Sequence, residues 1–259
     1  MNKKSFRNID YLESEDARDL RILSEYNYPH SEFIKKNVKD TIVMFGSARI
    51  KEASNIKQMI LDLESKEPQS KELKLLKNLA SLSNFYDDAR ELSKMITEWG
   101  IKISNHKEEK RLLVCTGGGP GIMEAGNRGA KEAGGTSVAL NISLPLERTN
   151  PYTDPELSFD FHYFFMRKLW FLYLSKGVVV FPGGFGTIDE LFETLTLIQT
   201  NKNEKNIPIL LYGKKFWEGV INFSALVEYM LISENDMKLI HFVDSPIDAF
   251  NLLKENVIL

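Results

Sequence analysis

The chain has 259 residues and a mass of 29.7 kDa, enough for one large domain whose core needs no disulfide or metal. Hydrophobic residues make up 43% and charged residues 27%, which argues against a disordered or membrane-embedded class. The net charge of −3 lacks the basic excess typical of nucleic-acid binding, so an anionic ligand has to be held by local groups.

The predicted elements alternate between strands and helices along most of the chain. Residues 1–40 are charged and predict a helical extension without a motif of its own. Short apolar runs that end in glycine or turn residues predict strands at 41–45, 111–115, 136–141, 177–181, 207–212 and 239–243. The segments between them predict helices at 72–99, 121–133, 163–175, 187–200, 215–232 and 246–256. Gly100 and Gly134 are expected at helix C-termini.

This alternation over residues 41–259 predicts an α/β fold class: a Rossmann-like, doubly wound, mainly parallel sheet with helices on both faces. Ligands of such sheets bind beyond the carboxyl ends of the strands, so we expect function in the strand-to-helix loops. The lysine- and glutamate-rich residues 51–77 predict a solvated insertion or a helical hairpin within the segment 51–84.

Cys115 is the single cysteine, which excludes an intramolecular disulfide and favours a reducing, cytoplasmic setting. It ends the apolar run 112–115, so a buried strand position is favoured over a nucleophile. We find no apolar run of signal-peptide or membrane-spanning length and expect no membrane partner. The four histidines contain no pair with metal-ligand spacing, so we expect neither a metal nor a cofactor.

The first glycine-rich turn, residues 116–121 (TGGGPG), follows a predicted strand and opens a predicted helix. Its N–H groups and the helix dipole could bind an anion. A dinucleotide fingerprint starting at Gly117 would need glycine at position 122, which is Ile122. A Walker A loop would need lysine after its last glycine, whereas Asn127 follows Gly126. NAD binding and ATP hydrolysis are therefore disfavoured.

The second glycine-rich turn, residues 182–190 (PGGFGTIDE), lies between an apolar strand and an amphipathic helix. Its glycines and the Thr187 hydroxyl could bind a phosphate. Glu190 falls one turn into the helix, and its side chain is expected to lean back toward the helix N-terminus. Residues 187–190 fit a capping box equally well, in which Glu190 only accepts a backbone N–H. Spacing alone leaves both interpretations open.

The second turn resembles the PGGxGTxxE signature of the Lonely Guy (LOG) family, whose members were once mislabelled lysine decarboxylases. Residues 45–49 resemble its first strand and turn, residues 116–130 its GGGxGxMxA-type loop, and residues 164–168 (FFMRK) its Arg-Lys segment. The resemblance covers about 41–50 and 86–232. Many plant-type members carry Met-His where this chain has Phe164 and Phe165, a difference that we associate with a bacterial branch.

The resemblance implies a phosphoribohydrolase that cleaves the N-glycosidic bond of AMP-like or cytokinin-like nucleoside 5′-monophosphates, giving free base and ribose 5-phosphate. It implies catalytic roles for Glu190, which would stabilise developing positive charge on the ribose or position the attacking water, and for Arg167, which would hold phosphate or sugar oxygens. Residues 41–259 are then the nucleotide-binding catalytic domain. The further substrate-binding residues expected are Gly46, Ser47, Gly118, Gly119, Glu124, Lys168, Gly183, Gly184, Phe185, Gly186 and Thr187.

Several alternatives stay open. Arg167 and Lys168 are also typical of a solvated helix edge beside a core, and Glu124 of an acid that stabilises a helix N-terminus. Asn141 and Glu147 could reach a base or sugar, but loop capping explains them as well. A non-catalytic nucleotide sensor, or a carrier of a larger phosphorylated cofactor, would use the same loops. No sequence feature marks a Schiff-base lysine with a pyridoxal phosphate pocket.

The predicted helix at 163–173 is aromatic and apolar on more than one face. Such a helix is typically covered on each of its apolar faces. We therefore expect a second subunit on it, in a homodimer or larger homo-oligomer, and no nucleic-acid partner.

Overall fold

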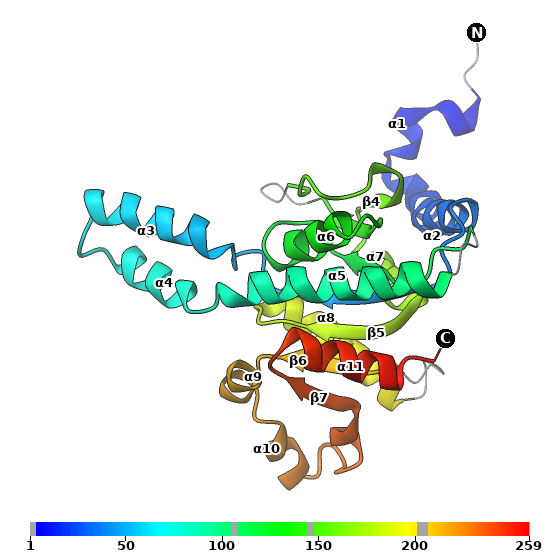
Figure 1. Ribbon diagram of the computed structural model, residues 1–259. Coiled ribbons are helices and arrows are strands. Elements are labelled where there is room, and N and C mark those ends of the chain that lie inside the picture. The colour runs from blue at the N-terminus through cyan, green and yellow to red at the C-terminus, as the bar shows by residue number, and fades with distance from the viewer. Residues whose placement is uncertain (1–3, 105–107, 144–147, 201–206, 259) are drawn as a thin grey trace.

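The computed structural model describes residues 4–104, 108–143, 148–200 and 207–258. Within these residues a parallel seven-stranded sheet has the order β4-β3-β2-β1-β5-β6-β7, and helices pack on both of its faces (Figure 1). The predicted Rossmann-like, doubly wound α/β fold is confirmed. The strands are β1 (Thr41–Phe45), β2 (Leu113–Thr116), β3 (Val138–Ile142), β4 (Ser158–Phe161), β5 (Ser175–Val180), β6 (Ile209–Tyr212) and β7 (Ile240–Val243).

All six predicted strands are present, and their ends lie within about two residues of the predicted ones. Strand β4 was not predicted from the sequence. It is a four-residue edge strand in which Phe159 and Phe161 are buried while Asp160 is exposed. Two apolar residues in a short alternating segment do not form the continuous run that marks an interior parallel strand.

The helices are α1 (Ile9–Leu12), α2 (Arg18–Lys35), α3 (Ala53–Lys66), α4 (Lys71–Ala80), α5 (Asn84–Ser104), α6 (Ile122–Glu132), α7 (Phe164–Tyr173), α8 (Phe185–Gln199), α9 (Lys214–Val220), α10 (Phe223–Glu228) and α11 (Pro246–Asn256). Short 3-10 turns occupy Ser5–Arg7, Glu15–Ala17, Pro155–Leu157 and Asp236–Leu239.

Two predicted helices are each two helices in the structure. The segment 72–99 divides at residues 81–83 into α4 and α5, where the Ser81 hydroxyl donates to the Asn78 carbonyl and so competes with continued helix. The segment 215–232 divides into α9 and α10, because the Asn222 side chain accepts from the Ala225 N–H and starts a new helix.

The prediction for Gly134 is confirmed, since it follows α6 with a φ of +75°. The prediction for Gly100 is wrong, because α5 continues to Ser104. Glycine is required at position 100 for packing instead: a Cβ there would overlap the Arg111 carbonyl.

The five interior strands, β1, β2, β3, β5 and β6, bury side chains on both faces of the sheet. In β1, Ile42 and Met44 belong to the core under α5, α6 and α11, whereas Val43 and Phe45 belong to the core under α2, α7, α8 and α9. This alternation follows from the two-residue period of a strand. Burial on both faces explains why the sequences of these strands are continuous apolar runs.

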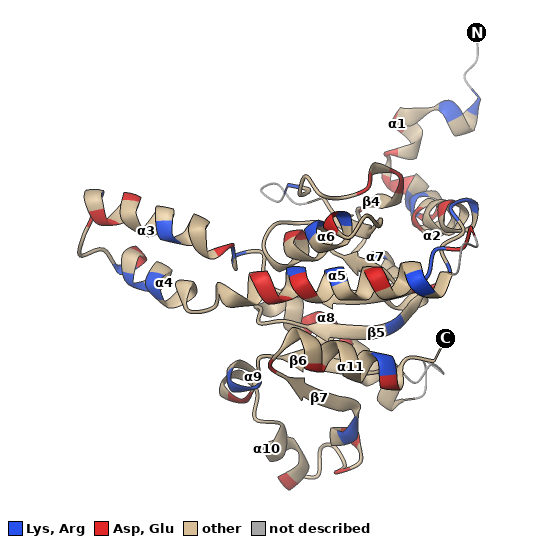
Figure 2. Cartoon of the chain, in the orientation of Figure 1, with Lys and Arg blue, Asp and Glu red and all other residues tan. Residues whose placement is uncertain are grey.

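Helices α3 and α4 form a hairpin that extends away from the sheet (Figure 1), with charged side chains along it (Figure 2). Its two helices are joined by an ion pair between Lys77 and Glu64. Helix α2 lies at the opposite side of the molecule and packs against α7. The domain boundary at residues 40 and 41 stays a prediction. No described helix has both the length and the apolarity needed to span a bilayer.

Candidate active site

The loops after β1 and β5 meet at the point where the strand order reverses. The chain adds β2, β3 and β4 on one side of β1 and then returns to add β5, β6 and β7 on the other. The Ser47 N–H donates to the Pro182 carbonyl at 3.0 Å, and the Ile122 N–H donates to the Ser47 carbonyl at 3.1 Å. These bonds tie together the β1 loop and both glycine-rich turns. A reversal of this kind leaves a crevice at the carboxyl ends of the strands.

A cavity of about 280 Å³ occupies this crevice. It is lined by eight of the predicted site residues, namely Gly46, Ser47, Arg167, Gly184, Phe185, Gly186, Thr187 and Glu190. The cavity is also lined by residues that were not among the predicted site residues, including Arg49, Gly117, Met123, Ile142, Phe164 and Asp189. The structure thus brings the two predicted catalytic side chains to the same cavity as the start of α8.

Three predicted glycines do not line this cavity. Gly118 has a φ of +72°, and its carbonyl and that of Gly119 accept hydrogen bonds from the Asn150 side chain. A Cβ on Gly183 would overlap the Thr187 side chain. Gly118 and Gly183 let their turns fold tightly, and Asn150 holds the first turn in place. Because Asn150 is distant from this turn in the sequence, no sequence pattern indicated the contact.

The structure also places Glu124 away from the cavity lining. Its carboxylate accepts from the Tyr86 hydroxyl at 2.8 Å, and Tyr86 in turn lies 3.5 Å from Arg128. Asn141 joins β3 to β4 and to the segment between them: its side-chain amide donates to the Ser158 hydroxyl at 2.9 Å, and its side-chain oxygen accepts from the Thr149 hydroxyl at 3.3 Å. Glu147 lies outside the described residues.

Arg167 of α7 is held by two backbone carbonyls. Its Nε donates to Leu140 at 2.7 Å and its Nη2 donates to Gly117 at 3.3 Å. The guanidinium lies 5.2 Å from the centre of the Phe171 ring, within the range of a cation–π contact. Gly117 makes room for it, because a Cβ there would overlap Nη2. The guanidinium is therefore fixed in position at the cavity.

Glu190 of α8 is the most deeply placed carboxyl that lines the cavity, with 12% of its side chain exposed. Burial raises the pKa of Glu190 to about 7 because it penalises the charged form. Lys168 and Arg167 act against this rise, whereas Glu193 and Asp189 add to it. A carboxyl with such a pKa changes its charge within the physiological pH range.

The capping-box interpretation of residues 187–190 is wrong. Helix α8 begins at Phe185 with Gly184 as its N-cap, so Thr187 is the third residue of the helix and cannot be its N-cap. Glu190 therefore lies in the second turn, beyond the position that a capping box requires.

Lys168 makes ion pairs rather than lining the cavity. Its Nζ lies 2.7 Å from Asp189, 3.5 Å from Glu190 and 2.6 Å from Glu193. The predicted role of Lys168 in anion binding has to compete with these three carboxylates.

Two glycines at the start of α8 have no packing reason to be glycine. A Cβ on Gly184 or Gly186 would meet no atom within 4 Å, and neither has a positive φ. Both line the cavity. Their bare backbone leaves space for a ligand to approach the N–H groups at the positive end of the helix dipole.

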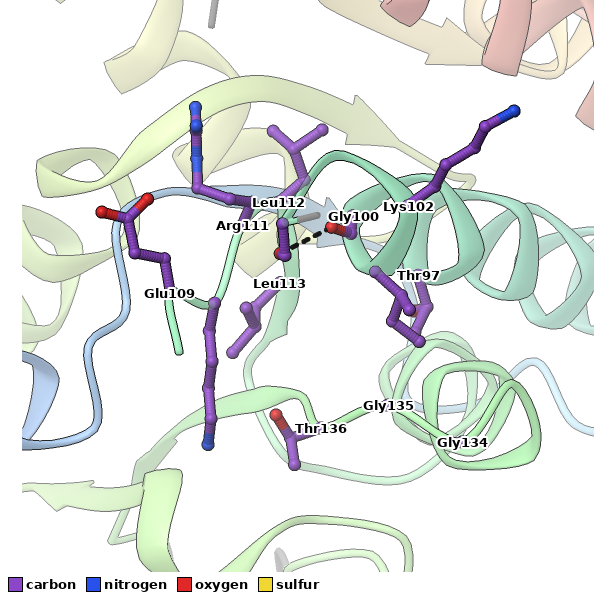
Figure 3. A pocket seen from close by; sticks show the side chains of 13 residues that line it. Thr97, Gly100, Lys102, Glu109, Arg111, Leu112, Leu113, Gly134, Gly135 and Thr136 are labelled. Carbon is purple, nitrogen blue, oxygen red and sulfur yellow. Dashed lines mark hydrogen bonds between the residues drawn. The ribbon is translucent and has the colours of Figure 1, made fainter. Parts of the chain in front are cut away.

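A larger cavity of about 620 Å³ lies at the opposite end of the strands, beside the amino ends of β2 and β3 (Figure 3). It is bordered by Thr97, Gly100, Leu113, Gly135 and Thr136 among others, and contains none of the predicted site residues. Cys115 is fully buried within β2, as predicted, and burial raises the pKa of its thiol. The smaller cavity is thus the one that combines a buried carboxyl, a guanidinium and a helix N-terminus.

Comparison with known proteins identifies the family of this chain. The model of a family described as possible lysine decarboxylase, the earlier label of the Lonely Guy proteins, matches residues 123–253, about half of the chain. The chain belongs to the Lonely Guy family. In this LOG protein the matched region runs from α6 into α11. It therefore contains both Arg167 and Glu190.

Two relatives are similar to parts of this LOG protein. The pyrimidine/purine nucleotide 5′-monophosphate nucleosidase of Escherichia coli K12 is 27% identical over 145 residues, covering 50% of this chain and 30% of the relative. An uncharacterized protein of Archaeoglobus fulgidus is 33% identical over 114 residues, covering 42% of this chain and 70% of the relative. The match thus spans less than a third of the length of the E. coli protein.

Among solved structures, the molybdenum cofactor carrier protein of Chlamydomonas reinhardtii is 20% identical, with a TM-score of 0.47 and coverage of 84% of this chain and 97% of that one. The molybdenum cofactor binding protein of Rippkaea orientalis is 22% identical, with a TM-score of 0.45 and coverage of 66% and 86%. Likeness at this level indicates nothing about the ligand of the LOG protein.

Proposed function

We propose that this protein is a nucleoside 5′-monophosphate phosphoribohydrolase, which hydrolyses the N-glycosidic bond to release a free base and ribose 5-phosphate. One observation carries the proposal: the carboxyl of Glu190 and the guanidinium of Arg167 line the same cavity as the open N-terminus of α8. The name of the E. coli relative, a nucleotide 5′-monophosphate nucleosidase, supports the same reaction class.

The 5′-phosphate would bind at the first turn of α8. The backbone N–H groups of Phe185, Gly186 and Thr187 are the ones that a helix leaves without intrahelical partners. The positive end of the helix dipole adds to their attraction for an anion. These local groups supply the attraction for a phosphate that a chain with a net charge of −3 does not provide overall.

Glu190 and Arg167 would act on the ribose. As the bond between C1′ and the base breaks, positive charge develops on the sugar, and an ionised Glu190 stabilises it and orients a water molecule toward C1′. The water oxygen forms the new bond to C1′, the bonding electrons leave with the base, and the base takes up a proton. Arg167, fixed by Leu140 and Gly117, would hold sugar or phosphate oxygens.

Two aromatic rings lie where the base would enter. Phe164 and Phe185 line the cavity, and the two residues are 52% and 94% exposed. Stacking on such rings is available to every base because each has a π-face. The proposed substrates are AMP-like or cytokinin-like nucleotides, and stacking of this kind would also accept the base of a pyrimidine nucleotide.

The direct test is incubation with a panel of nucleoside 5′-monophosphates, followed by chromatography for free base and ribose 5-phosphate. We expect release from at least one nucleotide and none from the nucleosides that lack phosphate. Glu190→Gln and Arg167→Ala should each lower kcat by about 100-fold or more. Glu218→Gln, which removes an exposed carboxylate on α9, is the matched control.

Binding of AMP without release of adenine from any panel member would contradict the proposal. That outcome would favour the nucleotide sensor, and retention of a larger phosphorylated cofactor through purification would favour the carrier.

We further propose a homodimer or larger homo-oligomer. Part of the apolar surface of α7 is covered within the chain, where Trp170 and Tyr173 pack against Tyr26 and His30 of α2. This leaves only part of the helix for the second subunit that the sequence predicts. Phe164, Phe165 and Leu169 remain exposed and are available to a partner. Light scattering at micromolar concentration tests this, and a monodisperse monomer would contradict it.

A further inference from the structure

Lys168 is the neighbour of Arg167 in the chain, but the two side chains have different surroundings. Arg167 lines the cavity, whereas Lys168 reaches from α7 to α8 and ends among three carboxylates. Only 13% of the Lys168 side chain is exposed. The three N···O distances, 2.7 Å to Asp189, 3.5 Å to Glu190 and 2.6 Å to Glu193, place its charge within reach of each acid.

The three acids differ in their exposure to water. The Asp189 and Glu193 side chains are 62% and 35% exposed, so water stabilises their charges. Glu190 is 12% exposed and gains least from water, so its ionised form depends most on neighbouring cations. The cations facing it are Lys168 and Arg167, and Arg49 lines the same cavity.

Lys168 itself remains a cation. Burial acts to lower the pKa of Lys168, but the carboxylates of Asp189, Glu193 and Glu190 act against this, and the pKa is raised overall. An ammonium group has three N–H donors, and here it is surrounded by three acids. A substrate phosphate would have to compete with these three carboxylates for the charge of Lys168.

We propose that Lys168 is a positioning residue, which keeps Glu190 ionised and directed at the reacting sugar instead of contacting the substrate. Asp189 and Glu193 hold the Lys168 ammonium at the shorter distances and so divide its charge among three acids. They limit how strongly Glu190 is ionised, and Lys168 supplies the charge that makes ionisation possible. The consequence for turnover rests on the proposed hydrolase function, whereas the effect on the charge of Glu190 does not.

The test compares variants that change the Lys168 cation with a variant that removes one of the competing carboxylates. Lys168→Met removes the cation, so the pKa of Glu190 should rise by about one unit or more, whereas Lys168→Arg should keep it near the wild-type value. Asp189→Asn removes an exposed competing acid and should shift the pKa of Glu190 downward. The pKa is read from carboxyl ¹³C chemical shifts of labelled glutamate, with the Glu190 signal assigned by its loss in Glu190→Gln.

Turnover gives the second measurement. Below its pKa, each unit of rise lowers the ionised fraction of Glu190 about tenfold. Lys168→Met should therefore lose about tenfold in kcat/KM at pH 6, recover much of it at pH 9, and change KM little. Lys168→Arg should rescue the pH profile. Lys214→Met, which removes a lysine paired with Glu218 on the surface, is the matched control and should leave the profile unchanged.

The outcomes separate the two proposals. A shift of the Glu190 pKa in Lys168→Met, together with no base release by the wild type, keeps the inference and overturns the hydrolase function. Base release by the wild type with an unshifted Glu190 pKa, or a large rise in KM at every pH, overturns the inference and makes Lys168 a substrate contact. If Lys168→Met does not fold, Asp189→Asn at its exposed position decides, and an unshifted or raised pKa in it overturns the inference.

Discussion

Glu25 accepts a hydrogen bond from the backbone N–H of His162 at 2.7 Å, although 137 positions separate the two residues in the chain. Its second carboxylate oxygen accepts from the Tyr163 N–H at 3.3 Å, and its backbone carbonyl accepts from the Trp170 indole at 3.0 Å. A carboxylate at a helix N-terminus satisfies N–H groups that the helix leaves open and interacts favourably with the dipole. Helix α2 thus holds α7, the helix that carries Arg167.

Replacing Glu25 should disturb both stability and turnover. Glu25→Ala removes both acceptors at the start of α7, and we expect a loss of about 1–2 kcal/mol in the free energy of unfolding. The displaced α7 should also lower kcat by about tenfold, since small misplacements of catalytic groups are costly. Urea unfolding and steady-state kinetics measure the two effects.

Glu32→Ala is the control for this variant. It removes an acid of the same helix which, among the described residues, forms an ion pair with Lys35 alone, three residues away. We expect a small stability change and wild-type kcat. Equal behaviour of the Glu25 and Glu32 variants would contradict a specific role for the α2 contact.

Gly186→Ala should separate ligand binding from folding. The new Cβ meets no atom within 4 Å, and alanine is the better helix former by about 0.5–1 kcal/mol, so the fold should be as stable or slightly more so. The methyl group would nevertheless stand at the proposed phosphate position and raise KM for AMP by about tenfold. Gly219→Ala on α9 also adds a methyl group in open space and should leave KM unchanged. Equal KM values for the two variants would place the phosphate elsewhere.

Gly117→Ala should act through Arg167. The added Cβ would overlap the guanidinium Nη2 and lie 2.8 Å from the Met123 sulfur, so both side chains have to move. We expect kcat to fall by at least tenfold with a stability loss of about 1–2 kcal/mol.

The control for loss of stability alone is Gly134→Ala. This position has a φ of +75° and open space around it, so alanine costs about 1 kcal/mol through the backbone only. It should keep wild-type kcat. A similar fall of kcat in both variants would show that stability, and not the position of Arg167, limits turnover.

Glu190→Gln should change the pH dependence of stability. The folded-state pKa of Glu190 is raised from 4.5 to about 7, so the protonated form is favoured by the fold. That contribution is fully present below pH 4.5 and is lost as the pH rises through 7, with a limiting size of roughly 3 kcal/mol.

Glutamine cannot ionise, so Glu190→Gln should unfold at a higher temperature than the wild type at pH 8, by a few degrees, and at nearly the same temperature at pH 4. Calorimetry at the two pH values measures this. A variant that is less stable than the wild type at pH 8 would show that the Glu190 carboxylate stabilises the fold.

Much of the fold was determined by local sequence. The apolar runs, the glycine turns after them and Gly134 after α6 fix strands and helix ends through hydrogen bonding and backbone conformation within a few residues. The PGGxGTxxE turn likewise located Glu190, and the Arg-Lys segment located Arg167. The strands and helix ends can be predicted from spacing because they depend on neighbours along the chain, whereas the roles expected of Glu190 and Arg167 came from the family resemblance.

Tertiary structure decided the rest. Only packing shows that β4 adds to the edge of the sheet, that Gly118 serves a tight turn while Gly186 faces open space, and that Lys168 lies among three carboxylates. The contact between Glu25 and α7 is of the same kind. Each depends on side chains that become neighbours only when distant segments bury their apolar surfaces together, and burial of that sort, unlike hydrogen bonding within a turn, leaves no fixed spacing in the sequence.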